Sequence, residues 1–167
     1  MSKIYGVVPG KVTSDPDEMG RVRVRLEYLG GENETYPAPV ATFMTGADRG
    51  SWFMPEIGDD VLCAFEQGNK EKPYVVGFLW NGQHRAPETD KSKRLLRSVK
   101  GHEITIFDAD GTDVMIGDGY IRISDASGNF LEMGNHSITL HCTGRLSLEA
   151  PIVTVNNRVA TTVPSTF

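Results

Sequence analysis

The sequence predicts an all-β protein, and three observations lead to this fold class. Apolar and polar residues alternate with a period of two along most of the chain, as in strands with one buried face. The 18 Gly and 9 Pro residues interrupt the 167-residue chain at short intervals, and no segment keeps helical apolar spacing over three turns. The C-terminal third repeats its apolar positions every 17 residues, which indicates stacked units that each bury little alone.

Residues 1–85 are expected to form five short strands, at about 4–12, 20–29, 40–44, 61–65 and 74–79. Pro9-Gly10 predicts a bend or an edge position in the first of them. Five strands in a segment of this length fit a small, closed or nearly closed barrel of the oligonucleotide/oligosaccharide-binding (OB) type. The expected barrel core is Val22, Val24, Leu26, Val61, Cys63 and Phe65.

The second strand carries a basic face, because Arg21, Arg23 and Arg25 alternate with its apolar residues. Such a face on an OB barrel can bind nucleic acid, which is one alternative function. Sequence-tolerant binding also needs aromatic side chains for base stacking, and here the aromatic residues lie on other segments. A net charge of −5 and a pI near 5.3 also disfavour bulk binding to nucleic acid or anionic membranes. We therefore expect the arginines to contact a neighbouring subunit or a partner protein.

Beyond the barrel, residues 86–98 read as a polar linker, residues 99–157 as the repeat region and residues 158–167 as a tail. Each 17-residue unit carries two short alternating segments and a turn rich in Asp, Ser and Gly. Two strands leave the three faces of a solenoid coil incomplete, so several copies of the chain are expected to combine, most simply around a threefold axis. A flat antiparallel meander lying on the barrel is the alternative.

The side chains expected to line the interior of the repeat region share the 17-residue spacing. They are Ile104, Ile106, Val114, Ile116, Ile121, Ile123, Leu131, Met133, Ile138, Leu140, Leu146 and Leu148.

The residues that could bind a metal ion or act in catalysis form only weak matches to known motifs. The acidic loop at 108–113 is reminiscent of a calcium site, but Gly119 stands where the loop needs a bidentate Glu, and such residues are also usual in turns. His102, His136 and His141 lack zinc-ligand spacing, although a threefold axis could bring three copies of one His together. No nucleophile elbow, zinc-protease or phosphate-loop motif is found. We expect no catalysis and no cofactor.

The chain is expected to be made as a soluble protein in a reducing cytoplasm. Cys63 and Cys142 lie far apart and do not suggest a disulfide framework. The N-terminus lacks a signal-peptide apolar region, and no apolar run approaches the ~18 residues of a membrane helix.

Six ordered segments resemble one family. They are GRVRVR at 20–25, MPEIGDDVL at 54–62, QGN at 67–69, KPYVVG at 72–77, WNG at 80–82 and RSVKGHEI at 97–104. This set is similar to the central spikes of contractile injection machines, namely phage baseplate assembly protein V and the type VI secretion valine-glycine repeat spikes. The resemblance covers most of residues 4–110, in the order of the family and near its spacing.

The resemblance implies a homotrimer with an OB barrel at its base and an intertwined triple-stranded β-helix as its needle. It implies that the barrel sits on a trimeric hub in a virion tail baseplate or contractile injection particle, with Arg21, Arg23 and Arg25 as candidate contacts to the hub or a subunit. Sheath contraction would drive the needle through a target cell envelope. A cell-wall-degrading tail enzyme is the remaining alternative.

Three departures from the family refine this expectation. No hub domain precedes the barrel, so the hub is expected to be a separate protein, and the short linker leaves no room for a lysozyme domain. A His-x-His motif for an iron tip is not found near the C-terminus. A separate cap of the proline-alanine-alanine-arginine repeat kind is therefore expected to contact the tail at Val163, Pro164 and Phe167.

Overall fold

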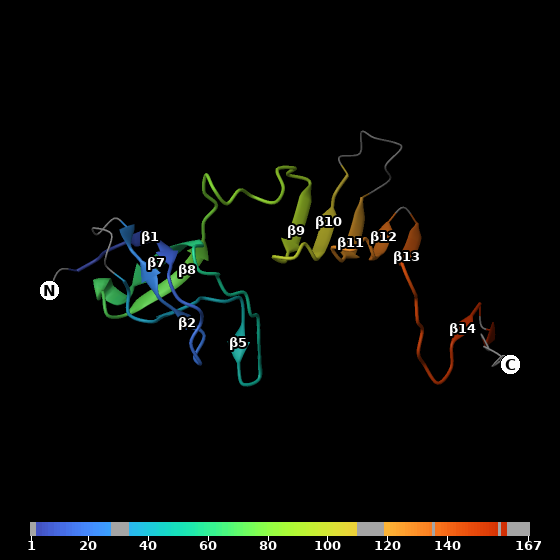
Figure 1. The fold of residues 1–167 in the computed structure, drawn as a ribbon, viewed down its shortest axis with the longest axis horizontal. Helices are drawn as coiled ribbons and strands as arrows, with labels where there is room; N and C mark the ends of the chain where they lie inside the picture. Colours follow the sequence, from blue (N-terminus) through green and yellow to red (C-terminus); the bar gives the residue numbers. More distant parts are fainter. Residues whose placement is uncertain (1–2, 28–33, 110–118, 135, 157, 160–167) are drawn as a thin grey trace. The chain divides into compact units, whose positions relative to one another are not determined.

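The computed structural model describes residues 3–27, 34–109, 119–134, 136–156 and 158–159. The chain divides into two compact units, Met1–Ala86 and Pro87–Phe167 (Figure 1). The regular structure of the described residues is β-strand, with short 3-10 turns such as Glu66–Gly68. The predicted all-β class is therefore confirmed. Among these residues no helix is long and apolar enough to cross a membrane.

The first unit is a small barrel. Its strands are β1 (Val7–Val12), β2 (Arg21–Val22), β3 (Val24–Arg25), β4 (Ala38–Pro39), β7 (Asp60–Phe65) and β8 (Pro73–Phe78). Strands β3, β1, β7 and β8 form an antiparallel sheet in that order, and β2 pairs with β4. The ring of strands closes through a parallel bridge between Val40 and Val75, where the Ala41 N–H donates to the Val75 carbonyl at 2.8 Å. This connectivity is that of an OB barrel.

The barrel core follows from the alternation of side chains along these strands, because successive residues of a strand point to opposite faces. Its buried members are Val8, Val12, Val22, Val24, Leu26, Ala38, Val61, Cys63, Phe65 and Val75. Most are β-branched, which suits a half-buried pleated surface. The buried hydroxyl of Thr35 is satisfied, since it accepts a hydrogen bond from the Val24 N–H at 3.1 Å.

Two features of the barrel differ from the expected strand pattern. The second strand is interrupted at Arg23, because the Arg23 N–H donates to the Ser14 hydroxyl at 2.9 Å instead of to a neighbouring strand. The third strand lies at Ala38–Pro39 instead of 40–44. The residues that follow it, 41–54, contain a separate hairpin of β5 (Thr45–Gly46) and β6 (Arg49–Gly50).

Burial of Cys63 makes a prediction about thiol chemistry. Desolvation in the core raises the pKa of the Cys63 thiol to about 11, so the reactive thiolate is scarce at neutral pH. In a Cys142→Ser variant, Cys63 should not react with a water-soluble disulfide reagent until the protein is denatured. A thiol titration before and after adding guanidinium measures this. Rapid stoichiometric reaction of the native variant would show that the barrel core is open.

The second unit is a five-stranded antiparallel meander with strand order β13-β12-β11-β10-β9, followed by a short hairpin. Its strands are β9 (Lys93–Arg97), β10 (Glu103–Phe107), β11 (Tyr120–Ser124), β12 (Phe130–Gly134), β13 (Ser137–His141), β14 (Thr154–Val155) and β15 (Arg158–Val159). Strands β10, β11, β13 and β14 begin 17 residues apart. The sequence repeat is thus a repeat of strands.

The turn between β11 and β12 illustrates why Asp and Gly recur in the repeat. The Asp125 carboxylate accepts hydrogen bonds from the backbone N–H groups of Ser127 at 2.8 Å and Asn129 at 2.9 Å. Gly128 has a φ of +90°, a conformation that side chains with a Cβ rarely adopt. These residues stabilise the turn, and the same hydrogen bonds lower the pKa of Asp125, the largest cause being the side chain of Asn129.

Two segments of this unit differ from the expected boundaries. Lys93–Arg97, assigned above to the linker, forms β9, which pairs antiparallel with β10 along its whole length. Residues 142–153, expected to supply the strand of Leu146 and Leu148, form no strand and pair with none among the residues that the structure describes. The expected interior residues Val114 and Ile116 and the expected cap contacts Val163, Pro164 and Phe167 lie outside the described residues.

Candidate functional site

The main candidate site is one face of the meander, which we call the apolar sheet face. Strand register aligns its side chains into two rows that cross all five strands. The first row is Leu96, Ile104, Ile123, Leu131 and Leu140. The second row is Ile106, Ile121, Met133 and Ile138, with Arg94 at its end on β9. Alternation within each strand therefore produces a continuous apolar surface.

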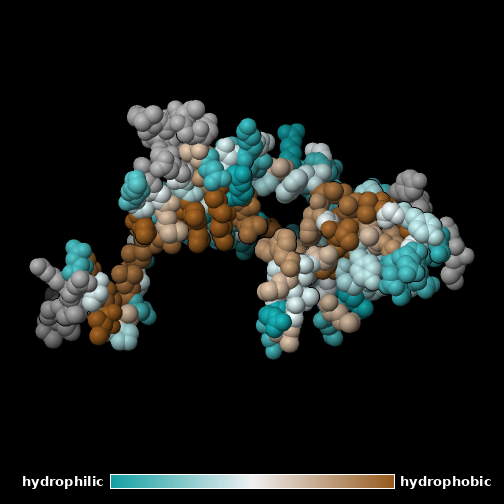
Figure 2. Space-filling model, turned by 180° about the vertical axis from the view of Figure 1, so that it is seen from behind, coloured by the Kyte–Doolittle hydropathy of each residue, from teal (hydrophilic) through white to brown (hydrophobic). Residues whose placement is uncertain are grey.

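This surface is uncovered within the chain. Apart from the half-buried Leu131, its hydrophobic side chains are between 40 % and 73 % exposed. Figure 2 shows the hydrophobic atoms of this sheet gathered in a band along one of its sides. Scattered apolar residues are normal on protein surfaces, whereas a large contiguous apolar patch marks a surface that binds something.

The opposite face of the meander is polar, and charged side chains on it form ion pairs with one another. Cross-strand ion pairs join Arg97 to Glu103 at 2.6 Å and Arg122 to Glu132 at 2.7 Å. A hydrogen bond from the Thr105 hydroxyl and the ion pair with Arg97 both lower the pKa of Glu103. Because these charges already have partners, this face is suited to solvent.

Aromatic contacts reinforce the polar face. The Arg122 guanidinium lies 4.3 Å from the ring centroid of Phe130, and Phe130 stacks on His141 at 4.9 Å. Phe107 and Tyr120 pair in the neighbouring row, with centroids 5.3 Å apart. The larger aromatic residues of the strands therefore pack on the polar side, so only the other side is left for an apolar partner.

The basic strand of the barrel is partly neutralised by its own neighbours. Arg21 forms an ion pair with Asp17 at 2.8 Å, and a hydrogen bond from Arg21 lowers the pKa of Asp17. Arg23 donates to the Thr35 carbonyl at 3.3 Å. Of the three arginines, these two are engaged within the chain, which leaves less positive charge for an external partner than the sequence suggested.

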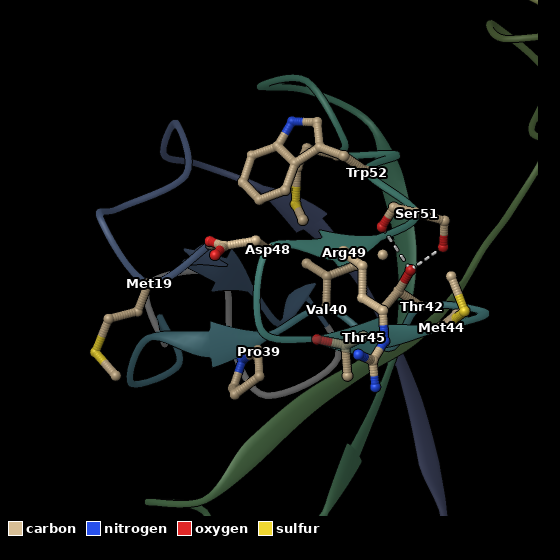
Figure 3. A pocket seen from close by; sticks show the side chains of 13 residues that line it. Met19, Pro39, Val40, Thr42, Met44, Thr45, Asp48, Arg49, Ser51 and Trp52 are labelled. Carbon is tan, nitrogen blue, oxygen red and sulfur yellow. Dashed lines mark hydrogen bonds between the residues drawn. The ribbon is translucent and has the colours of Figure 1, made fainter.

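A shallow hollow of about 460 Å³ lies beside the β5–β6 hairpin (Figure 3). Met19, Met44 and Trp52 supply much of its apolar lining, while Asp48 comes from the hairpin turn and Arg49 from β6. Its polar contacts are few: the Thr42 hydroxyl donates to the Ser51 carbonyl at 2.7 Å and also bonds the Ser51 hydroxyl. Exposed apolar side chains with a few polar groups among them are suited to contact with another protein.

The residues considered for metal binding do not assemble. Among residues 3–27, 34–109, 119–134 and 136–156, no three His, Cys, Asp or Glu side chains come together as a metal-binding group. His141 lies on the polar face, stacked on Phe130. His136 occupies the turn between β12 and β13 with a φ of +58°. The acidic loop at 108–113 lies mostly outside the described residues.

An OB barrel joined to a repeat sheet with one uncovered apolar face defines a β-structural module built to associate with other chains. Residues 7–80 match the family described as "Type VI secretion system/phage-baseplate injector OB domain". The predicted resemblance of the chain to the spikes of type VI secretion systems and phage baseplates is thus confirmed, and the matched residues are those of the first unit.

The relatives found by sequence comparison are spike proteins. The chain is 26 % identical over 131 residues to the type VI secretion system spike protein VgrG1a of Pseudomonas aeruginosa, covering 70 % of this chain and 20 % of VgrG1a. It is 31 % identical over 91 residues to VgrG2a of the same organism, covering 52 % and 11 %. It is 25 % identical over 132 residues to VgrG3 of Vibrio cholerae, covering 75 % and 11 %. The chain therefore spans a fifth or less of the length of these relatives.

Sequence reasoning missed two parts of these surfaces. Leu96 extends the first apolar row onto β9, but it lies among basic residues that indicated a linker. Phe43 and Met44, which precede β5, are exposed, although their apolar side chains predicted that they belong to a barrel strand at 40–44. A search for apolar residues one strand before the first repeat would have found Leu96, whereas no local signal distinguishes an exposed hairpin from a core strand.

Proposed function

We propose that this protein is the central spike of a contractile injection machine. Its OB barrel docks on a trimeric hub at the end of the tail tube, and its repeat region forms the needle of a homotrimer. Contraction of the sheath pushes the needle through the envelope of a target cell. The proposal assigns no catalytic step to the chain, which acts by transmitting force.

The observation that carries the proposal is the apolar sheet face. Its first row is apolar on all five strands and its second row on four of them, from β10 to β13, while the opposite face pairs its own charges. A two-layer arrangement is the minimum that buries one face of a sheet. If three copies turn these faces toward a common axis, the rows become the dry interior of a prism and the charged faces remain in water.

The unpaired segment after β13 supports intertwining over simple stacking of sheets. Residues 142–153 carry the exposed Leu146 and Leu148 in apolar/polar alternation, yet within the described part of the chain they pair with no strand. Backbone N–H and C=O groups require partners once they leave water. A neighbouring copy that wraps alongside would supply these partners, as in an interlocked β-helix.

In this proposal the two units have different roles. The barrel has a self-contained core, so it can fold and dock as a preformed base. The needle buries its apolar rows between chains, so its stability depends on protein concentration. The tail residues Val163, Pro164 and Phe167 are proposed to meet a cap at the tip.

Mass measurement under native conditions tests the proposal. The expected result is a complex of three times the 18.3 kDa chain mass that persists at micromolar concentration. A species of one chain mass would favour a meander folded onto its own barrel, and a species of two would favour a face-to-face sandwich. Either outcome would remove the threefold needle.

A further inference from the structure

The barrel carries a second unpartnered apolar surface, which we call the hairpin surface. It consists of Phe43, Met44, Trp52 and Phe53, which flank β5 and β6 and are 91 %, 55 %, 67 % and 53 % exposed. Hairpins that end in solvent usually carry polar side chains, because an exposed aromatic ring gains nothing from water. These four residues therefore indicate a contact that the isolated chain does not make.

Both sides of the hairpin contribute to this surface. Met44 and Trp52 line the hollow (Figure 3), and a Cβ on Gly20 would lie 3.2 Å from the Trp52 ring. Phe43 and Phe53 lie outside the hollow and touch each other edge to face, with centroids 6.3 Å apart. A hairpin with apolar residues on both sides cannot bury them all against its own barrel, so an external partner has to enclose it.

The area of the hairpin surface is that of a specific interface. Because an aromatic side chain carries about 150–250 Å², the four residues and the adjoining Met19 expose roughly 600–700 Å². The largest apolar patch on a typical monomer is about 300–600 Å², and each partner in a standard interface contributes about 800 Å². Aromatic residues and Met are also the types enriched at interface cores.

A third surface lies on other strands of the same barrel, on the outward side of β1, β7 and β8. We call it the outer barrel surface, and its residues are Val7, Pro9, Leu62, Ala64, Tyr74 and Val76. Register places Val7 beside Ala64, Pro9 beside Leu62 and Ala64 beside Tyr74. Their neighbours Val8, Cys63 and Val75 point into the core, so these six side chains face out. The ion pair of Lys11 with Asp60 at 3.0 Å borders these six residues on the same side of the strands, so the outer barrel surface is an apolar patch with a charged edge.

Symmetry links the two surfaces. A threefold ring needs a heterologous contact, in which two different patches of each chain meet head to tail. A chain that trimerises only through its needle would need no such pair on its barrel. The hairpin surface projects from the end of β4, whereas the outer barrel surface occupies β1, β7 and β8, so one chain presents both halves of a ring contact.

We propose that in the assembled spike the β5–β6 hairpin of each copy packs on the outer barrel surface of the next copy. The three barrels then form a closed ring, which adds a second contact between copies to the trimer that the needle holds together. This inference rests on the threefold assembly proposed above. It assigns the hairpin to a second copy of this chain, leaving the end of the ring for the hub.

Cysteine crosslinking tests the ring contact in the full-length chain. The background is Cys142→Ser, since Cys63 is buried, and the pair is Thr45→Cys on the hairpin with Val76→Cys on the outer barrel surface. A short bismaleimide should link neighbouring copies and give covalent trimers on a denaturing gel. The matched control pairs Thr45→Cys with Asp15→Cys, an exposed loop position away from the outer barrel surface, and should give no covalent trimer.

Native mass is recorded in parallel, so that the two proposals fail separately. Adding Trp52→Asp and Phe53→Asp to the Thr45/Val76 pair should abolish the link while the needle keeps the native mass trimeric. A native trimer with no link, or with the same link in the control, overturns the hairpin contact and leaves the proposed function standing. A monomeric native mass overturns both. A link that survives the double Asp variant overturns the role of the hairpin side chains.

Discussion

Leu140→Asp is expected to convert the trimer into single chains. Leu140 belongs to the first apolar row and lies directly across from Leu131. In the proposed needle, the substitution removes about 1.5–3 kcal/mol of apolar burial per copy. It also brings three carboxylates together in an apolar interior, where desolvation costs several kcal/mol for each ion. Together these terms exceed the free energy that a trimer of this size can spare, so dissociation should be complete at micromolar concentration.

The same substitution should leave the barrel folded, because the barrel has a core of its own. Sedimentation should therefore report one chain mass while circular dichroism keeps the β signal of the barrel. Ser137→Asp is the matched control: it adds the same charge to the same strand, but at a polar-face position paired with Gly134. A trimeric Leu140→Asp variant with unchanged melting would contradict the proposed interior.

Local alternation made much of this architecture predictable. The second barrel strand alternates valine and arginine, so its inward and outward residues can be assigned before any partner strand is known. The repeat is equally local, because each unit restarts with the same apolar pair, such as Ile104 and Ile106 or Ile121 and Ile123. The motifs at 54–62 and 72–77 then gave the resemblance to the spike family, and they lie at the entries to β7 and β8.

Features set by distant contacts were not predictable in the same way. Lys93–Arg97 becomes a strand because its backbone pairs with β10, where Arg97 also meets Glu103, and composition alone made this segment look like a linker. The aromatic residues around β5 and β6 carry the same strand propensity as core residues. Whether such a residue is buried or exposed depends on the whole barrel and on its partners, which local sequence does not encode.

Gly10→Ala is expected to destabilise the barrel strongly, because Gly10 stands where a Cβ has no room. A Cβ at this position would lie 2.5 Å from the Cγ1 atom of Val24 and 2.8 Å from the Arg25 carbonyl oxygen. Both contacts are below van der Waals distance, and the carbonyl belongs to β3, the strand that flanks β1. Overpacking of this kind costs about 1–3 kcal/mol or more, which corresponds to a fall of roughly 5–20 °C in the Tm of a domain of this size.

Gly77→Ala provides the matched control, since it makes the same change on β8 of the same sheet, where a Cβ would meet nothing within 4 Å. Its Tm should stay close to that of the parent, or rise slightly as the unfolded chain loses freedom. Because the needle does not depend on Gly10, Gly10→Ala should lower the melting of the barrel without lowering the native trimer mass at 25 °C. Equal melting of the two variants would mean that β1 and β3 are not packed as closely as their register requires, and the OB barrel would then need a different strand pairing.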